Sequence, residues 1–124
     1  MEKLSDMIQV ADWKKEKHVP VIEAPDTVKA DELFEVRVGI GKEIAHPNTT
    51  EHHISWISLY FQPEGDKFPY QVGHFEFNGH GEGTVFTSPT ATVALKVDKP
   101  GVLRGLSFCN IHGLWESSKE IGVS

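Results

Sequence analysis

The sequence of 124 residues contains a single cysteine, Cys109, and no long run of apolar residues. One cysteine cannot form a disulfide within the chain, so the composition does not point to an oxidising compartment. A membrane-spanning helix needs about 20 consecutive apolar residues, and no segment approaches that length. The first residues are charged and do not resemble a signal peptide. We therefore expect a cytoplasmic protein that has no membrane partner.

Positive charge is also scarce in this sequence. Its 12 lysine and arginine residues are outnumbered by 18 aspartate and glutamate residues, and the formal net charge is -6 at pH 7. Proteins that bind nucleic acid generally carry a basic surface, so this balance argues against nucleic acid as a partner. The 39% hydrophobic and 24% charged residues are typical of a globular domain. The length fits one domain, which we place at residues 1–124.

Most of the chain alternates apolar and polar residues over short segments and shows no convincing helical period. Within residues 33–40, every second side chain from Phe34 to Ile40 is apolar, as in a half-buried strand. Residues 53–61 are apolar on both faces, which indicates a central strand or one covered by a partner subunit. Together with the regular turn signals, this pattern predicts an all-β sandwich.

Three shorter segments allow more specific predictions. Residues 19–23 contain Pro20, which cannot donate a hydrogen bond to a central ladder, so we expect an edge strand there. Residues 102–109 alternate again, which places Cys109 at the end of a strand. Residues 84–86 are expected to form a brief strand after a loop.

The cysteine belongs to a short motif of possible chemical importance. Cys109 and His112 form a Cys-x-x-His step, which fits in one tight turn, so that sulfur and imidazole can face the same point. A thiolate and an imidazole at this spacing suit a soft or borderline transition metal. By itself the motif is weak, because a lone buried cysteine is more often a small apolar core residue.

Two upstream segments supply further imidazoles. Residues 46–53 contain three histidines, and residues 16–20 contain another beside an acid and a base. Each lies in a loop or at a strand end, where a rigid sheet can present side chains to one point. Because neighbours in a strand point to opposite faces, only one of His52 and His53 should reach a given site. The candidate ligands are His18, His46, His52, Cys109 and His112.

Four imidazoles and one thiolate exceed the four ligands of a structural zinc site, and they lack the carboxylate of a facial-triad iron site. They suit a five-coordinate metal with four nitrogens in a plane and sulfur on the axis. A thiolate pushes electron density toward whatever binds opposite to it, as in thiolate-ligated haems. Blue-copper proteins are also β-sandwiches, but Met1 and Met7 lie far before the cysteine and weaken that reading. Copper, structural zinc and iron all stay open on these grounds.

Three segments carry a resemblance to a known family: residues 16–20 (EKHVP), 46–53 (HPNTTEHH) and 109–115 (CNIHGLW). Together they resemble the signature segments of superoxide reductase, whose single-iron form is also called neelaredoxin. The two-iron relative, desulfoferrodoxin, has an additional four-cysteine iron centre, for which this chain with one cysteine lacks the ligands. The resemblance implies an immunoglobulin-like β-sandwich of about seven strands.

The resemblance also implies a site and a reaction. One iron ion per chain would have four equatorial histidine ligands and an axial cysteine, and it would reduce superoxide to hydrogen peroxide without releasing dioxygen. Glu16 resembles the acid that takes the sixth position when the iron is oxidised, and Lys17 resembles the lysine that attracts superoxide and helps to deliver protons. By motif matching, the iron ligands are His18, His46, His52, His112 and Cys109.

The implied biological role is superoxide detoxification, with rubredoxin as the electron donor and a homo-oligomer, most often a tetramer, as the assembly. The alternative is a metal-binding electron carrier, either cupredoxin-like or a non-enzymatic iron protein. We expect amides of Asn110 and Ile111 to donate to the thiolate and tune its potential. Trp115 could shield the metal. His53, His74 and His80 are interpreted as ordinary polar or hydrogen-bonded histidines.

Overall fold

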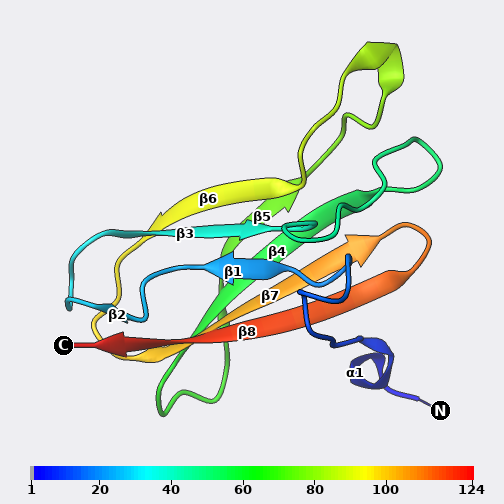
Figure 1. The fold of residues 1–124 in the computed structure, drawn as a ribbon. Helices are drawn as coiled ribbons and strands as arrows, with labels where there is room; N and C mark the ends of the chain where they lie inside the picture. Colours follow the sequence, from blue (N-terminus) through cyan, green and yellow to red (C-terminus); the bar gives the residue numbers. More distant parts are fainter. Residues whose placement is uncertain (1) are drawn as a thin grey trace.

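The computed structural model describes residues 2–124, and nearly all of their regular structure is β-strand (Figure 1). A four-residue helix α1 (Leu4–Met7) and a 3-10 turn η1 (Glu82–Thr84) are the helical elements of this described part. No helix within it is long and apolar enough to cross a membrane. The strands are β1 (Val21–Glu23), β2 (Thr27–Val28), β3 (Phe34–Gly39), β4 (Ile54–Pro63), β5 (Tyr70–Glu76), β6 (Thr90–Leu95), β7 (Gly101–Cys109) and β8 (Gly113–Val123).

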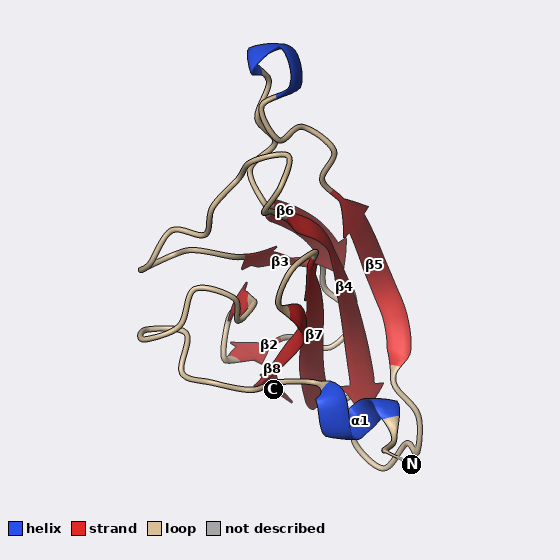
Figure 2. Cartoon of the chain, turned by 90° about the vertical axis from the view of Figure 1, so that its right-hand side faces the viewer, coloured by secondary structure: helices blue, strands red, loops and turns tan. Residues whose placement is uncertain are grey.

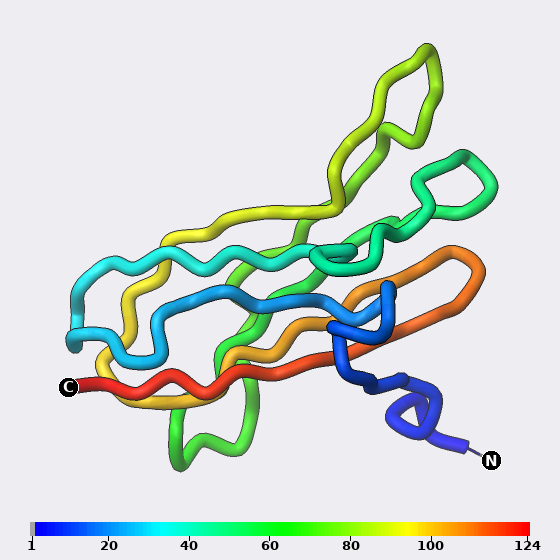
Figure 3. Tube along the Cα trace, viewed as in Figure 1, coloured from blue at the N-terminus to red at the C-terminus, as the bar shows by residue number. Residues whose placement is uncertain are grey.

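The strands form two sheets that pack face to face. One sheet has the order β1-β3-β6 and the other has the order β2-β8-β7-β4-β5. Adjacent strands run antiparallel, apart from the two-residue parallel pairing of β2 with β8. Figure 3 follows the chain as it passes between the layers. This architecture confirms the all-β, immunoglobulin-like sandwich. The described residues form eight strands, compared with about seven expected. The two-residue strand β2 is too short to leave a pattern in the sequence.

Alternating apolar residues fill the space between the sheets. Val36 and Val38 of β3 face Ile57 and Leu59 of β4, and all four are fully buried. Each such side chain contributes about 1.5–3 kcal/mol on burial. A one-residue slip of a strand would turn its apolar set toward solvent, so this pattern also fixes the register. The alternation expected in residues 33–40 is therefore confirmed.

The positions of two other strands were also predicted correctly. Strand β4 lies between β7 and β5, so the doubly apolar segment is central. Strand β1 is an edge of the three-stranded sheet, and buried Pro20 immediately precedes it. In contrast, residues 84–86 do not form a strand. Gly81, Gly83 and Thr84 have positive φ values, which bend the backbone and leave only an isolated bridge between His80 and Phe86.

The loops at one end of the sandwich hold all the segments with candidate ligands. Figure 2 looks toward this end, onto the β3–β4 loop (residues 40–53) and the β5–β6 loop (residues 77–89). The tight turn between β7 and β8 and the segment before β1 lie at the same end (Figure 1). The packing of one sheet on the other thus brings together residues that are far apart in sequence, as in the 94-residue separation of His18, before β1, and His112, in the β7–β8 turn.

Candidate metal centre

Four of the candidate ligands converge at this end of the sandwich. The donor atoms of His18, His46, His52 and Cys109 all lie within 4.8 Å of one another. Two opposed nitrogens that each bind a metal at about 2.1 Å would be about 4.2 Å apart. The spacing of these atoms is therefore close to that of a coordination sphere.

The imidazole rings are arranged as a square. Neighbouring ring centroids are 4.8 Å apart for His18 and His46, and 4.7 Å for His46 and His52. The separations are 5.0 Å for His52 and His112, and 4.8 Å for His112 and His18. His18 and His52 are 6.4 Å apart, as expected across a diagonal. This arrangement matches four nitrogens in one plane, and it places His112 with the other candidate ligands.

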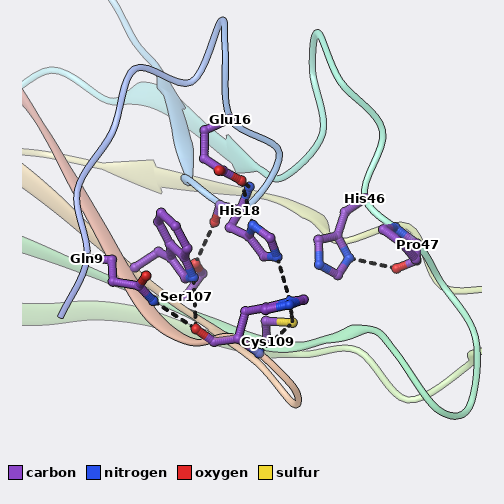
Figure 4. Close-up of polar contacts among 9 residues, drawn as sticks. Gln9, Glu16, His18, His46, Pro47, Ser107 and Cys109 are labelled. Carbon is purple, nitrogen blue, oxygen red and sulfur yellow. Dashed lines mark hydrogen bonds and ion pairs between the residues drawn. The ribbon is translucent and has the colours of Figure 1, made fainter. Parts of the chain in front are cut away.

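His18 is oriented by contacts on both its ring and its backbone (Figure 4). Its Nδ1 lies 2.5 Å from the Glu16 carboxylate, which also accepts a hydrogen bond from the His18 amide at 3.0 Å. A carboxylate can only accept, so the ring carries its proton on Nδ1 and presents a lone pair on Nε2. The hydroxyl of fully buried Ser107 donates to the His18 carbonyl at 3.1 Å. The ring of Trp115 stacks on His18, with centroids 4.9 Å apart.

The other two Nε2 donors are buried and lack partners. Nδ1 of His46 lies 2.7 Å from the Pro47 carbonyl, so this ring also has its proton on Nδ1 and a lone pair on Nε2. Nε2 of His46 and Nε2 of His52 are inaccessible to solvent and have no hydrogen-bond partner among residues 2–124. Buried polar atoms are nearly always paired, so two such atoms facing one point indicate a ligand. A metal ion would satisfy both.

Burial also disfavours protonation of these rings. The pKa of His46 is lowered to about 4, mainly by burial and also by the charges of His18, His52 and Lys17, although the hydrogen bond to Pro47 opposes the shift. The pKa of His52 is likewise lowered by burial, and then by the charges of His112 and Lys17. At neutral pH these rings therefore keep their lone pairs, as metal ligands must.

The turn between β7 and β8 presents the sulfur and the fourth imidazole together. The His112 amide donates to Sγ of Cys109 at 3.4 Å, and Nδ1 of His112 lies 3.8 Å from the same sulfur. Nδ1 of His112 is also 3.1 Å from Nε2 of His18, so this ring faces the site through Nδ1. Gly113 has a φ of 84°, which is the left-handed conformation that lets the turn close. The side chain of Gln9 donates to the His112 carbonyl at 2.8 Å.

One expectation for this turn was wrong. The Asn110 amide does not donate to the thiolate but to the His53 carbonyl, at 3.2 Å. Its side chain accepts a hydrogen bond from the His53 amide at 2.8 Å and donates to the Glu51 carbonyl at 2.9 Å. Asn110 therefore links the turn to the β3–β4 loop. The amide that donates to sulfur belongs to His112.

Glu16 and Lys17 lie beside the cluster. Burial alone would raise the pKa of Glu16, but hydrogen bonds from the His18 ring and amide outweigh this effect and lower it. The carboxylate lies on the Nδ1 side of His18, away from Nε2. Lys17 is half-buried, and its charge lowers the pKa values of both His46 and His52.

The remaining histidines lie outside the cluster, with His53 stacked on His80 and His74 beside Ser58.

Three residues that support the ligands were not identified from the sequence. Ser107 was detectable, because it is a polar residue at an inward position of an alternating strand. Gln9 and the side chain of Asn110 gave no comparable signal, since their partners are 103 and 59 residues away. Trp115 lies beside the cluster, where its indole donates to the His112 carbonyl at 3.3 Å, and shielding of the metal by this ring stays a prediction.

The donor set fits one iron ion better than its rivals. A structural zinc site would use four of the five donors and leave the fifth without a role. Blue copper uses two histidines and a cysteine with a weak axial ligand, whereas four imidazoles surround this site. The four imidazoles and the Cys109 thiolate would together hold one iron ion with five donors, fewer than the six of an octahedral site.

Comparisons with known proteins agree with this chemistry. Residues 10–118 match the desulfoferrodoxin family. Neelaredoxin from Megalodesulfovibrio gigas is 62% identical, with 98% of each chain covered. Superoxide reductase from Pyrococcus furiosus is 54% identical, covering 92% of this chain and 95% of its own. A crystal structure of a candidate superoxide reductase from Thermotoga maritima, 56% identical, superposes with a TM-score of 0.97 over 100% of this chain and 99% of its own. The chain therefore belongs to the desulfoferrodoxin family.

Proposed function

We propose that this protein is a superoxide reductase, which reduces superoxide to hydrogen peroxide at one iron ion per chain without releasing dioxygen. The observation that carries the proposal is the square of four imidazoles with the Cys109 thiolate beside it. Relatives with 54–62% identity that bear the names superoxide reductase and neelaredoxin support it. The proposed ligands are His18, His46, His52, His112 and Cys109.

Iron held by these residues would supply the one electron that, together with two protons, converts superoxide into hydrogen peroxide. The protein prepares the site in three ways. The Cys109 thiolate contributes negative charge, and the hydrogen bond from the His112 amide moderates that charge. Contacts at Nδ1 orient the His18 and His46 rings. Burial of the Nε2 atoms excludes water that would compete for the ring nitrogens.

Lys17 is proposed to attract the substrate and to help deliver protons. Superoxide is an anion, and the protein has a net charge of -6, so the overall field opposes its approach. The charge of Lys17 is close enough to lower the pKa values of two ligand histidines. Charges farther than about 8 Å are largely screened at physiological salt. A nearby lysine can therefore dominate the local field.

Glu16 is proposed to have two roles. In the structure its carboxylate fixes the tautomer of His18. After oxidation it would act as the sixth ligand, since a hard carboxylate prefers ferric to ferrous iron. This second role requires the carboxylate to leave Nδ1 of His18, to which it is bonded in the structure.

The cellular setting of the proposal follows from the same family. We propose one domain over residues 1–124, a cytoplasmic location, rubredoxin as electron donor and a homotetrameric assembly. The outer face of β4 supports self-association, because Trp56 stacks on Phe108 there and both rings stay partly exposed. Sedimentation of the purified protein tests the tetramer, and reduction by rubredoxin in a stopped-flow instrument tests the donor.

The decisive experiment combines metal analysis with product analysis. Protein from its native source is expected to contain about one iron per chain, and the reduced protein should convert superoxide into peroxide with negligible dioxygen. Stoichiometric copper or zinc would overturn the metal assignment. Catalytic dioxygen release would indicate a dismutase. A reversible redox change without any reaction with superoxide would indicate the electron carrier instead.

A further inference from the structure

Two histidines outside the metal centre form a close pair. The rings of His53 and His80 are nearly parallel, with an interplanar angle of 6° and centroids 3.6 Å apart. His53 belongs to the β3–β4 loop and His80 to the β5–β6 loop, so the pair joins two loops. His80 is only 7% exposed, although Val85 and Phe86 of the same loop are more than 60% exposed. His80 is thus a buried polar ring close to the exposed tip of its loop, and its contacts show what it holds in place.

The ring of His80 also makes a hydrogen bond to the β3–β4 loop. Its Nδ1 lies 2.8 Å from Oδ1 of Asn48. Nδ2 of Asn48 donates to the Thr87 carbonyl at 3.1 Å, and this bond sets the orientation of the amide. Oδ1 must then be the acceptor, so His80 donates from Nδ1. Asn48 is thus held between two residues of the β5–β6 loop.

The segment held in this way carries two of the proposed iron ligands. Asn48 lies between His46 and His52 in the β3–β4 loop, which has no regular secondary structure. On one side, the loop is anchored to the β7–β8 turn by Asn110. On the other side, the contacts through His80 and Thr87 anchor it to the β5–β6 loop.

The His80 ring is itself fixed by its own loop. Its backbone amide donates to the Glu82 carboxylate at 2.8 Å. Residues Gly79 and Thr87 close the base of the loop with hydrogen bonds of 2.7 Å and 3.0 Å. Because the β5–β6 loop is held closed in this way, it can serve as a rigid support for its neighbour.

We propose that His80 is a positioning residue that holds the β3–β4 loop in the shape that aligns His46 and His52 for iron. This inference rests on the proposed metal centre and adds a residue to it. Without the His80 ring, the loop would sample shapes in which the two Nε2 atoms do not face the same point. The apparent affinity for a ligand falls in proportion to the fraction of molecules in the competent shape.

The size of the effect follows from similar contacts. Removal of an outer partner of a metal ligand typically weakens metal binding by about 10- to 100-fold. His80 acts through Asn48 and His53 rather than on a ligand directly. We therefore expect His80→Ala to weaken ferrous iron binding by about 10-fold, at the lower end of that range.

Three variants separate the two contacts of the ring. His80→Ala removes both the stacking and the hydrogen bond. His80→Phe keeps a flat ring against His53 but has no donor for Asn48, whereas His80→Asn keeps a short donor without the ring. His74→Ala is the matched control, since that histidine contacts Trp56, Ser58 and Glu76 on β4 and β5 rather than the β3–β4 loop.

Two measurements on the purified, iron-free proteins test the proposal. Hydrogen exchange is expected to accelerate in peptides covering residues 46–53 of His80→Ala, and anaerobic titration with ferrous iron against a competing chelator should give the weaker binding. His80→Phe and His80→Asn should fall between the parent and His80→Ala, and they carry the test if His80→Ala does not fold. His74→Ala should match the parent in both measurements.

Unchanged exchange in residues 46–53 would overturn the proposal. A lower melting temperature with unchanged iron affinity would also overturn it, because His80 would then serve only general stability. Failure of the proposed function looks different: the parent protein itself would not reduce superoxide, while the exchange comparison would still report on the loop.

Discussion

The two ends of the β-sandwich satisfy their polar groups in different ways. At the metal end, buried rings and carbonyls are held by side chains such as Glu16, Ser107 and Gln9. At the opposite end, turns close mainly through backbone hydrogen bonds, as from the Glu64 amide to the Pro100 carbonyl. The ion pair between Lys119 and Asp26 there is open to water, with 92% of the Asp26 side chain exposed. Lys119 lowers the pKa of Asp26 through a hydrogen bond and its charge.

The opposite end of the sandwich also holds a cavity, although none of the candidate ligands lies there. A cavity of about 520 Å³ lies between the turn at Glu64 and the start of β7, with Glu120 in its wall. Glu64 and Glu120 in its lining are exposed, whereas the metal end of the described chain has two buried nitrogen atoms without hydrogen-bond partners. Buried ring nitrogens without hydrogen-bond partners therefore locate the chemistry of this protein better than the volume of a cavity does.

Replacing Cys109 by serine should have the largest effect on the metal end. The oxidised protein is expected to show a thiolate-to-iron charge-transfer band in its visible spectrum. Cys109→Ser removes the thiolate, so the band should vanish while the four histidines retain much of the iron. Val102→Ala, on the same strand at the opposite end, should keep the band. A band that persists in Cys109→Ser would show that sulfur is not a ligand.

Loss of the Lys17 charge should have the next largest effect. Electrostatic steering raises association rates by roughly 10- to 1,000-fold, and one lysine should lie at the low end of that range. We expect Lys17→Ala to slow the second-order reaction with superoxide about 10-fold and to flatten its dependence on salt. Lys119→Ala makes the same charge change at the other end and should leave the rate unaltered. Pulse radiolysis across a salt series measures both, and equal rates with equal salt slopes would leave Lys17 without a role.

Glu16→Ala should separate the spectrum from the reaction rate. The variant is expected to change the spectrum of the oxidised protein, because the carboxylate would no longer bind ferric iron. The first step with superoxide should keep nearly the parent rate. Glu120→Ala, from the opposite end, should change neither quantity. Identical oxidised spectra of Glu16→Ala and the parent at every pH would exclude Glu16 as a ligand.

The smallest expected effect comes from replacing one glutamine at each end of the sandwich. Gln9 donates to the His112 carbonyl, and Gln62 donates in the same way to the Asp66 carbonyl at 3.1 Å. Each lost hydrogen bond should cost about 1 kcal/mol of stability, so Gln62→Ala should lose more than Gln9→Ala, because Gln62 also accepts a hydrogen bond from Arg104 at 3.0 Å. Only Gln9→Ala should also weaken ferrous iron binding, because only its partner carries a ligand. Equal iron affinities in Gln9→Ala and Gln62→Ala would contradict this distinction.

Local patterns were sufficient to predict the framework. The alternation in β3 and the doubly apolar β4 follow from burial on one face and on both faces, so their places in the sheets could be predicted. The ligand histidines were predictable because they lie in short motifs with Cys109. The strand prediction for residues 84–86 failed because the β-prone side chains of Val85 and Phe86 did not reveal the positive φ values beside them.

The contacts that support the ligands could not be predicted, because they join residues that are far apart in sequence. Asn48 and His80 are 32 residues apart, and Gln9 and His112 are 103 residues apart. No periodic pattern connects such pairs, and their contact depends on loop shapes that form only after the sheets have packed. The role expected for the Asn110 amide failed for the same reason, since its partner His53 lies on another loop.

The long separation between ligands has a consequence for folding kinetics. His18 and His112 are 94 residues apart, so they meet only when β1, β7 and β8 are in place. Contacts of such high sequence separation tend to form late, after the entropy of loop closure has been overcome. Iron should then leave the refolding rate nearly unchanged and slow unfolding, as interactions absent from the transition state do. Stopped-flow unfolding of iron-loaded and iron-free protein measures this effect. Equal unfolding rates would show that the site is already assembled in the folding transition state.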